Sequence, residues 1–413
     1  MNDPGQKQLR LLYFTAEQWP TFRPDVVALF GKYLPRSGIT SDLVTERNLA
    51  LPPNADIPWR GGQTILCDVP RNRAGQYWVK MWHNLRVLMT LNSKEYDAIQ
   101  VRDMSLTALV GLVVARIKGI PFFYWLSYPQ SEGQISRAKS RGIKSGMRFW
   151  FPLVQGVFGK WLLYRFVLPM ADHVFVQSRW MQLAVAEQGV AINHMTPVPM
   201  GVDTEMTKAE QICPIDDPRL VGRRALVYLG TLDPDRKIEI LFLMLAHVRE
   251  VFPEALLLLV GDTTDAAHRN WLKQKAELSG VSHHVIWTGW LESAVAWRYA
   301  KAAEIGLSPI PRGYLLDMAS PTKAVEYMAL GLPVVVNDNP DQSEVIAESE
   351  AGYCVPLEPT RFSESVIRLM GDAELRLRMS AAGREYVSHA RAYDRIAEHV
   401  ATVYRASFSR QRP

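Results

Sequence analysis

A lysine and a glutamate stand three residues apart in an otherwise apolar segment, SPTKAVEYMALGLPVVV, at residues 320–336. Ser320 is predicted to cap a helix that begins at the proline after it. The free N–H groups of Thr322 and Lys323 would then point toward the preceding loop, and such a helix start favours anions such as phosphate. Lys323 adds a positive charge there. Glu326, one turn further on, is placed to accept hydrogen bonds from sugar or ribose hydroxyls.

The same spacing has a simpler alternative, in which Lys323 and Glu326 form an i,i+3 ion pair on the protein surface. The rest of the segment predicts a buried helix followed by a buried strand. Gly331 ends the helix, and the β-branched run at 334–336 is typical of a strand covered on both faces. The helix would bury one apolar stripe, made of Ala324, Val325, Met328 and Ala329.

Composition indicates a folded protein of two domains. The chain has 413 residues, of which 48% are hydrophobic and 22% charged. Its three cysteines lack the number and spacing of a disulfide framework or a zinc site, and the first residues show no signal-peptide core. We therefore expect a cytoplasmic protein. The net charge of +5 suits an anionic ligand or membrane surface, and no nucleic-acid partner is indicated.

Strand and helix patterns alternate along the whole chain, which is typical of parallel sheets with crossover helices. The pattern restarts after PVPMGVD at 197–203. We predict an α/β fold of two doubly wound domains facing each other across a cleft, divided as 1–200, 201–390 and a last helical segment, 391–413. The predicted strands lie at 10–15, 96–101, 120–126, 171–178, 224–230, 254–262, 283–289, 304–310 and 332–336.

Several motifs occur in a fixed order, namely PVPMGVDTE, YLGTLDPDRKIEILF, LLLLVGD, VIWTGWL, AAEIGLSPI and the segment at 320–336. In order and spacing they resemble the retaining GT-B glycosyltransferases of family 4 (group 1), which transfer sugars from nucleotide-sugar donors. The resemblance covers about residues 171–355. The first 170 residues match only in strand rhythm and in YDAIQVRD.

The resemblance implies a donor site. Gly230 matches the glycine of the family's first loop, and Arg236 stands where the family has a lysine. Arg236 and Lys323 would neutralise the leaving diphosphate, and Glu326 would hold the ribose, with Ser320 and Thr322 beside them. The alternative for Arg236 is a solvated residue within DPDRK. The resemblance also implies retention of anomeric configuration, with UDP- or GDP-sugar as the donor and no other cofactor. It further implies that residues 1–200 are the acceptor-side domain, that residues 201–390 bind the nucleotide sugar, and that the last helix, at 391–413, packs back toward the N-terminal domain.

Two departures from the family pattern point to other functions. Met318 stands where many members have the first of two glutamates, Asp317 is one position out of register, and Thr231 replaces an arginine. The chain resembles the subset with S-P-x-K-x-x-E-Y-M-A. The departures motivate one alternative, a catalytically impaired partner of another glycosyltransferase. A nucleotide-sugar 2-epimerase-like enzyme is a second, because it uses the same architecture.

Fewer features of the sequence indicate where an acceptor would bind. Asp103 follows a predicted strand and is a candidate to orient an acceptor hydroxyl, with helix capping as the alternative. Arg23 and Asp25 follow the first strand and are candidates to line the cleft. No metal site is predicted, since the acids and histidine of GDTTDAAH at 261–268 fit an ordinary strand-end loop.

Residues 136–171 combine basic residues with a Trp- and Phe-rich stretch that is too interrupted to span a bilayer. The pattern fits either an interfacial element on an anionic membrane or a long buried crossover helix with a basic end. The first possibility predicts peripheral contact with the inner face of the cytoplasmic membrane. It also predicts a glycan or lipid-linked glycan acceptor, as in the synthesis of surface or exopolysaccharides.

Overall fold

The computed structural model describes residues 8–48, 57–70 and 73–409, and the chain forms two compact units. The first unit extends to Pro199 and includes the last helix from Tyr393 onward, and the second runs from Met200 to Ala392. The residues before Leu9 that bear on the signal-peptide prediction lie largely outside the described part.

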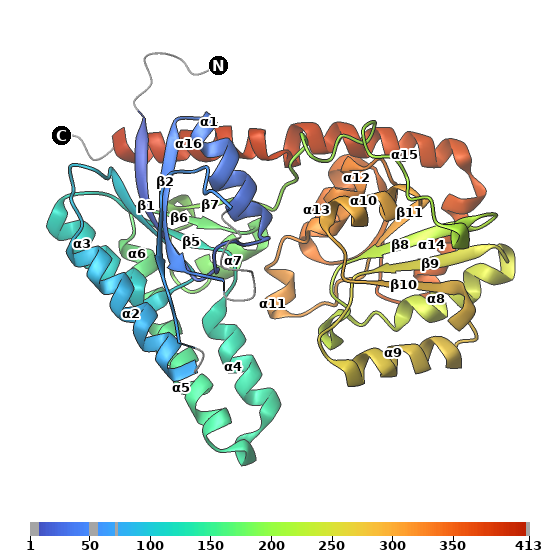
Figure 1. The fold of residues 1–413 in the computed structure, drawn as a ribbon, viewed down its shortest axis with the longest axis horizontal. Helices are drawn as coiled ribbons and strands as arrows, with labels where there is room; N and C mark the ends of the chain where they lie inside the picture. Colours follow the sequence, from blue (N-terminus) through green and yellow to red (C-terminus); the bar gives the residue numbers. More distant parts are fainter. Residues whose placement is uncertain (1–7, 49–56, 71–72, 410–413) are drawn as a thin grey trace. The chain divides into compact units, whose positions relative to one another are not determined.

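The first unit is built on a parallel sheet of 7 strands in the order β3-β2-β1-β4-β5-β6-β7 (Figure 1). Its strands are β1 (Leu9–Thr15), β2 (Ile39–Glu46), β3 (Thr64–Cys67), β4 (Ala98–Arg102), β5 (Phe122–Leu126), β6 (His173–Val176) and β7 (Met195–Pro197). Its helical segments are η1 (Asp25–Tyr33), α1 (Leu34–Arg36), α2 (Arg73–Met89), α3 (Ser105–Lys118), α4 (Gln130–Arg141), η2 (Ile143–Ser145), α5 (Met147–Leu162), η3 (Leu163–Val167), α6 (Leu168–Met170), α7 (Arg179–Ala186), η4 (Ile192–His194) and α16 (Tyr393–Ser409).

The second unit has a parallel sheet of 6 strands in the order β10-β9-β8-β11-β12-β13. Its strands are β8 (Arg224–Leu229), β9 (Ala255–Val260), β10 (Val285–Gly289), β11 (Ile305–Ser308), β12 (Val334–Asn337) and β13 (Gly352–Val355). Its helical segments are η5 (Pro218–Leu220), η6 (Pro234–Arg236), α8 (Ile240–Val251), α9 (Ala266–Leu278), η7 (Ser282–His284), α10 (Ser293–Lys301), α11 (Tyr314–Asp317), α12 (Thr322–Ala329), α13 (Pro340–Ser349), α14 (Pro359–Gly371), α15 (Ala373–Tyr386) and η8 (Val387–Arg391).

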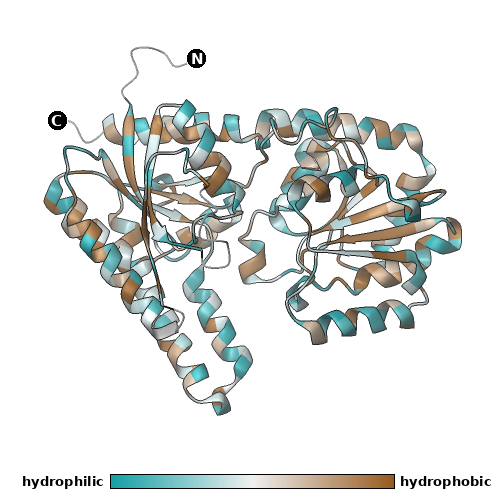
Figure 2. Cartoon of the chain, in the orientation of Figure 1, coloured by the Kyte–Doolittle hydropathy of each residue, from teal (hydrophilic) through white to brown (hydrophobic). Residues whose placement is uncertain are grey.

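Strand β8 shows why these apolar runs form buried central strands. Leu226 and Tyr228 enter the core on one face of the sheet, whereas Val227 and Leu229 enter the core on the other. A strand covered on both faces needs apolar residues at every position rather than at every second one. Figure 2 shows the resulting hydrophobic character of the strands in both sheets. The predicted α/β fold of two parallel-sheet domains is confirmed.

Four strands, β2, β3, β7 and β13, were not predicted, and β2 shows one reason. Asp42 lies in the middle of this strand and is fully buried, so the strand lacks an uninterrupted apolar run. Its carboxylate lies 2.6 Å from Arg10 Nη2 and accepts hydrogen bonds from Tyr96 Oη at 2.7 Å and from the Gln63 N–H at 2.9 Å. These partners from neighbouring segments compensate its burial, and local sequence does not reveal them.

Both sheets place a topological switch point beside their first strand. In each sheet the second and third strands extend to one side of the first, and the later strands extend to the other. Ligands of such sheets bind at the carboxyl ends of the strands where this order reverses. The crevices to inspect therefore lie beyond β1 and β4 in the first unit and beyond β8 and β11 in the second.

Residues 136–171 hold the end of α4, the turn η2 and a continuous helical run of α5, η3 and α6. The run belongs to the crossover from β5 to the parallel strand β6, but α5 is not buried as that alternative expected, because it exposes large apolar side chains. Helices α4 and α5 pack closely because Gly156 faces α4, where a Cβ atom would lie 2.7 Å from the Ser131 carbonyl oxygen. Pro152 lies inside α5, and the Arg148 carbonyl, which the proline cannot bond, accepts a hydrogen bond from Arg141 Nη1 at 3.4 Å. Among the described residues, no helix is long and apolar enough to cross a bilayer.

Candidate functional site

The second unit brings most of the predicted donor-site residues together at its switch point. Gly230 and Arg236 belong to the loop after β8, while Lys323 and Glu326 belong to α12, which follows β11 in the chain. Helix α12 is anchored by Tyr327, whose hydroxyl accepts a hydrogen bond from the Leu229 N–H at 2.6 Å. The buried stripe predicted for this helix is confirmed.

Gly230 lets Lys323 lie against the loop after β8. Its φ of 134° favours glycine, and a Cβ atom at this position would lie 2.8 Å from Lys323 Cε. The Lys323 ammonium also lies 5.3 Å from the centre of the Tyr228 ring. The lysine side chain therefore reaches across the carboxyl end of β8, toward the loop that carries Arg236.

The charges of this cluster influence one another. Burial, reinforced by the nearby Arg236 guanidinium, lowers the pKa of Lys323 to about 8. Burial also raises the pKa of Glu326 above its ordinary value, although the positive charge of Lys323 opposes the change. Both side chains keep some exposed surface while their charged groups lie deep among protein atoms. Two cations held close together favour an anion between them, and Glu326 offers an acceptor nearby.

The surface-pair alternative for Lys323 and Glu326 is not what the structure shows. No contact within 4.0 Å joins the ammonium of Lys323 to the carboxylate of Glu326, both of which are described residues. The arginine of this cluster is half-buried, so it is not fully solvated either. Neither side chain is used up by the other, and both remain able to bind a ligand at the switch point of the second sheet.

Ser320 does not cap α12, so that part of the prediction is wrong. Pro321 occupies the N-cap position, and no side chain caps this helix. The Ser320 hydroxyl donates to Asp341 Oδ2 at 3.0 Å and accepts from the Met200 N–H at 3.0 Å and from Arg391 Nη1 at 3.2 Å. This buried serine fixes the loop before α12, and the N–H groups at the helix start, those of Thr322 and Lys323, stay unused by a cap.

Neither Met318 nor its neighbour Asp317 supplies an unpaired carboxylate in place of the family's first glutamate. Met318 is fully buried. The neighbouring Asp317 carboxylate lies 2.9 Å from Arg312 Nε and is largely buried itself. Within the described residues, no group of three or more His, Cys, Asp or Glu side chains is arranged as metal ligands.

Asp103 lies in the first unit, at the carboxyl end of β4, with a left-handed φ of 56°. It does not cap α3, because Met104 holds the N-cap position. Its carboxylate instead accepts hydrogen bonds from the Ser127 N–H at 2.8 Å, the Tyr128 N–H at 3.3 Å and the Ser127 hydroxyl. Burial raises the pKa of Asp103. The residue thus fixes the loop between β5 and α4.

The residues beside Asp103 are also held internally. Arg102 is fully buried, and its Nη2 lies 2.7 Å from the Asp25 carboxylate at the start of η1. Asp25 was expected to line the cleft, but only 2% of its surface is exposed, so that expectation is wrong. Arg23 lies 3.6 Å from Asp25 and is half-exposed.

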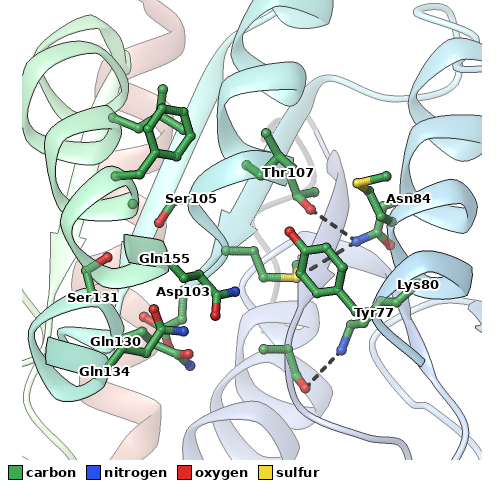
Figure 3. Close-up of a pocket in the computed structure, with 17 residues that line it drawn as sticks. Tyr77, Lys80, Asn84, Asp103, Ser105, Thr107, Gln130, Ser131, Gln134 and Gln155 are labelled. Atoms are coloured by element: carbon green, nitrogen blue, oxygen red, sulfur yellow. Dashed lines mark hydrogen bonds between the residues drawn. The ribbon is translucent and has the colours of Figure 1, made fainter. Parts of the chain in front are cut away.

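A cavity of about 290 Å³ opens beside Asp103 in the first unit (Figure 3). Its lining comes from the loop after β1, the end of β4 and helices α2 to α5. The residues are Ala16, Tyr77, Lys80, Met81, Asn84, Asp103, Met104, Ser105, Leu106, Thr107, Gln130, Ser131, Gln134, Gln155, Phe158, Gly159 and Leu162. Except for Asp103, sequence reasoning missed this set. One signal was available, since Gln130, Ser131 and Gln134 lie within eight residues of the end of the predicted strand at 120–126.

Comparison with known proteins agrees with the fold. Residues 19–201 match the profile described as "Glycosyl transferase 4-like domain", and residues 217–386 match "Glycosyl transferases group 1". The crystal structure of Anabaena Alr3699/HepE in complex with UDP superposes with a TM-score of 0.70 at 18% identity, covering 96% of this chain and 100% of that one.

Curated relatives are similar over part of their length. A phosphatidyl-myo-inositol mannosyltransferase of Mycobacterium leprae (strain TN) is 28% identical over 55% of this chain and 56% of the relative. A GDP-mannose-dependent alpha-(1-6)-phosphatidylinositol monomannoside mannosyltransferase of Mycobacterium tuberculosis (strain CDC 1551 / Oshkosh) is 26% identical over 50% of this chain and 55% of the relative. The matching part of the chain thus spans about half the length of these proteins. The two profiles match one sheet each, so the chain combines a region similar to the glycosyl transferase 4-like domain with a region similar to the glycosyl transferases of group 1, in a two-domain fold of the GT-B type.

Proposed function

We propose that the protein transfers a sugar from a nucleotide-diphosphate sugar to a hydroxyl of a glycan or lipid-linked glycan. The observation that carries this proposal is the cluster of Arg236, Lys323 and Glu326 at the switch point of the second sheet. The two cations and the N–H groups at the start of α12 are the groups that would bind a diphosphate. The relatives named as mannosyltransferases and the neighbour solved with UDP support a nucleotide sugar as donor.

In this mechanism the cations act on the leaving group. As the bond from the sugar to the diphosphate breaks, negative charge grows on the diphosphate and positive charge on the sugar ring. Arg236 can bind two phosphate oxygens at once through its planar guanidinium, and Lys323 adds a point charge. Glu326 accepts a hydrogen bond from a ribose hydroxyl. The acceptor hydroxyl oxygen bonds to the anomeric carbon from the side of the leaving group as the bond to the diphosphate breaks, and its proton passes to the departing diphosphate oxygen, so that anomeric configuration is retained.

The helical hairpin α4–α5 supports an acceptor at a membrane. Figure 1 shows the hairpin extending beyond the first sheet. Residues 133–171 contain no Asp or Glu, and six of their seven basic residues are exposed, namely Arg137, Lys139, Arg141, Lys144, Arg148 and Arg165. The seventh, Lys160, is partly buried and lies 3.6 Å from Glu132. One face of α5 exposes a stripe of large apolar side chains, Trp150, Phe151, Val154, Val157, Phe158 and Trp161. We propose that this hairpin contacts an anionic membrane surface and that the product is a surface or exopolysaccharide.

Met318 and the engaged Asp317 favour a second candidate, a catalytically impaired partner of another glycosyltransferase. A thermal-shift panel of UDP-, GDP- and ADP-sugars followed by donor hydrolysis or transfer separates the two. A donor at 100 times its dissociation constant stabilises the folded protein by about 2.7 kcal/mol. Transfer that Glu326→Ala abolishes supports the enzyme. Donor binding without turnover supports the partner, and no shift with any nucleotide sugar contradicts both.

A further inference from the structure

A buried ion pair lies against the loop that precedes α12. Arg391 is the last residue of η8, and Asp341 belongs to the first turn of α13. Arg391 Nη2 lies 3.0 Å from Asp341 Oδ1, and the two residues are only 5% and 4% exposed. A charged side chain buried to this extent needs a partner of opposite charge. The mechanism derived above uses neither residue, so their role in the second unit has another explanation.

The hydroxyl of Ser320 connects this pair to the start of α12. It donates to Asp341 Oδ2 at 3.0 Å and accepts from Arg391 Nη1 at 3.2 Å, so it is bonded to both partners at once. Only Pro321, whose ring restricts the backbone, separates Ser320 from the first residue of the helix. Because Lys323 is the second residue of α12, a displacement of Ser320 is passed on to the lysine.

The same side chains hold both ends of the second unit. The Met200 N–H donates to the Ser320 hydroxyl at 3.0 Å, and the Met200 carbonyl accepts from Arg391 Nη1 at 3.4 Å. The Arg391 carbonyl in turn accepts from the Val202 N–H at 2.8 Å. Met200 is the first residue of this unit, and Arg391 stands one residue before its end. The donor-site helix thus begins where the chain enters and leaves the unit.

The form of the contacts indicates that they fix geometry. A buried ion pair contributes little net stability compared with apolar side chains of the same volume. The planar guanidinium of Arg391, however, directs Nη2 to Asp341 and Nη1 to Ser320, which the single nitrogen of a lysine cannot do. Segment η8, which ends at this arginine, winds as a π-helix, and such wide turns frequently occur at functional sites.

We propose that Arg391 is a positioning residue of the donor site. Through Ser320 it holds the start of α12 and so keeps Lys323 against Gly230 at the end of β8. Arg391 is itself too deeply buried to touch a donor. The proposal rests on the donor role assigned above to α12. Loosening of the contacts among Arg391, Ser320 and Asp341 should let the helix start move and bring the lysine ammonium into water.

The first test measures Lys323 in the full chain without any ligand. Acetylation with acetic anhydride over a range of pH, followed residue by residue with mass spectrometry, gives the pKa of a single lysine. Burial, reinforced by Arg236, lowers the pKa of Lys323 to about 8, and this burial depends on the position of α12. Ser320→Ala and Arg391→Lys should each raise it by about one pH unit, toward the ordinary value.

The two variants are chosen so that the protein still folds. Ser320→Ala removes the connecting hydroxyl and leaves the ion pair in place. Arg391→Lys keeps a cation opposite Asp341, whereas alanine at this position would leave the carboxylate buried and unpaired. Arg361→Ala is the matched control, because Arg361 forms an exposed ion pair of 3.1 Å with Glu364 in the same unit. The control should titrate as the wild type does.

A pKa of Lys323 that is unchanged in both Ser320→Ala and Arg391→Lys overturns the proposal. An equal change in the control overturns it too, and so does a wild-type lysine that titrates at the ordinary value. Each of these results would show that the contacts of Arg391 do not determine how deeply Lys323 is buried. The titration needs no nucleotide, so its result does not depend on the function proposed above.

Binding of UDP and GDP to the same four proteins, measured by calorimetry, tests the donor site separately. Ser320→Ala and Arg391→Lys should weaken binding of the nucleotide that the wild type prefers by about three- to tenfold, which corresponds to one lost hydrogen bond. Wild-type affinity in both variants contradicts a positioning role in the donor site, even where Lys323 titrates differently. Absence of binding by the wild type contradicts the proposed function, whereas the titration still decides whether Arg391 positions Lys323.

Discussion

The cluster of Arg236, Lys323 and Glu326 beside β8 and β11 and the cavity beside β1 and β4 occupy the same topological position in their sheets. Their side chains differ. In the second unit, Arg236 and Lys323 keep positive charge next to each other, and this lowers the pKa of Lys323. In the first unit, Arg102 and Asp103 are buried in internal contacts, and neutral amides remain. The same position in the fold therefore carries different chemistry in the two units. It is positively charged in the second unit, whereas in the first unit the charges are paired internally and neutral amides remain.

The largest effect should follow removal of either cation in the second unit. Arg236→Ala and Lys323→Ala are each expected to lower turnover with a nucleotide sugar by about 10²–10³-fold. Charge on the diphosphate grows as the bond breaks, so the loss should affect kcat more than KM. Steady-state kinetics measure it. Lys273→Ala, at an exposed lysine of α9, is the control. Unchanged turnover in both variants would show that the positive charge of Arg236 and Lys323 has no role in catalysis.

Glu326→Ala should weaken binding of the bare nucleoside diphosphate and of the sugar nucleotide to a similar extent. A hydrogen bond to a charged acceptor contributes roughly 1.5–3 kcal/mol, or about a 10- to 150-fold change in affinity. A nucleotide without ribose hydroxyls should bind wild type and variant alike, and Glu277→Ala controls for loss of a surface carboxylate. Calorimetry with the three ligands settles the role. Equal affinities for the ordinary nucleotide would show that Glu326 does not hold the ribose.

Asp103→Asn should act on folding in the first unit more than on donor chemistry. Asparagine tolerates the left-handed backbone but removes the charge that the loop N–H groups and Arg102 share. We expect a loss of about 1–3 kcal/mol in the free energy of unfolding, measured with denaturant. The same stability together with lost transfer would instead indicate that Asp103 orients the acceptor hydroxyl directly.

The pH dependence of donor binding should reflect Lys323. Its pKa of about 8 lies below the ordinary value of 10.5, and a bound diphosphate favours the charged form. Affinity should therefore be full below pH 8 and fall above it, by at most about tenfold per pH unit. Lys323→Arg should bind with a flat profile, because arginine stays charged throughout. A wild-type profile as flat as that of this variant would contradict the assigned titration.

For folding the sign is the reverse. An unfolded lysine keeps its proton up to about its ordinary pKa of 10.5, whereas folded Lys323 loses it near 8. Between these values the unfolded state binds more protons, so this residue's contribution to the free energy of unfolding rises with pH. Measurements of stability and of nucleotide affinity on the same samples should thus change in opposite directions over this range.

Sequence alone predicted the second unit better than the first, and physical reasons explain the difference. The central strands of the second unit are uninterrupted apolar runs followed by polar loops, so the strand ends and the residues expected at a donor site can each be predicted from one short pattern. In the first unit, β2 is stabilised through Asp42 and its distant partners, and the cavity combines α2, α4 and α5. Asn84 and Gln155 are far apart in the chain and carry no local pattern.

Ser320 shows the same limit within a well-predicted segment. A serine before a proline and an apolar helix is a good candidate for a cap. Here the hydroxyl is bonded to Asp341 and Arg391, which come from later segments of the chain. Those two residues also form an ion pair of 3.0 Å, and Arg391 carries the backbone carbonyl that binds the Val202 N–H at 2.8 Å. Only the folded unit reveals that the serine belongs to this network.

Helix α16 has a consequence for how the chain is made. Tyr393, Ala397, Val400 and Tyr404 lie in the same core as Leu11 of β1 and Phe30 of η1. A ribosome releases these four residues only after the whole of residues 200–392 has been synthesised. Domains usually fold as they emerge, the N-terminal one first. Here the core of the first unit stays incomplete until residues 393–409 have been synthesised. The second unit, residues 200–392, is therefore the first to have all of its residues available for folding.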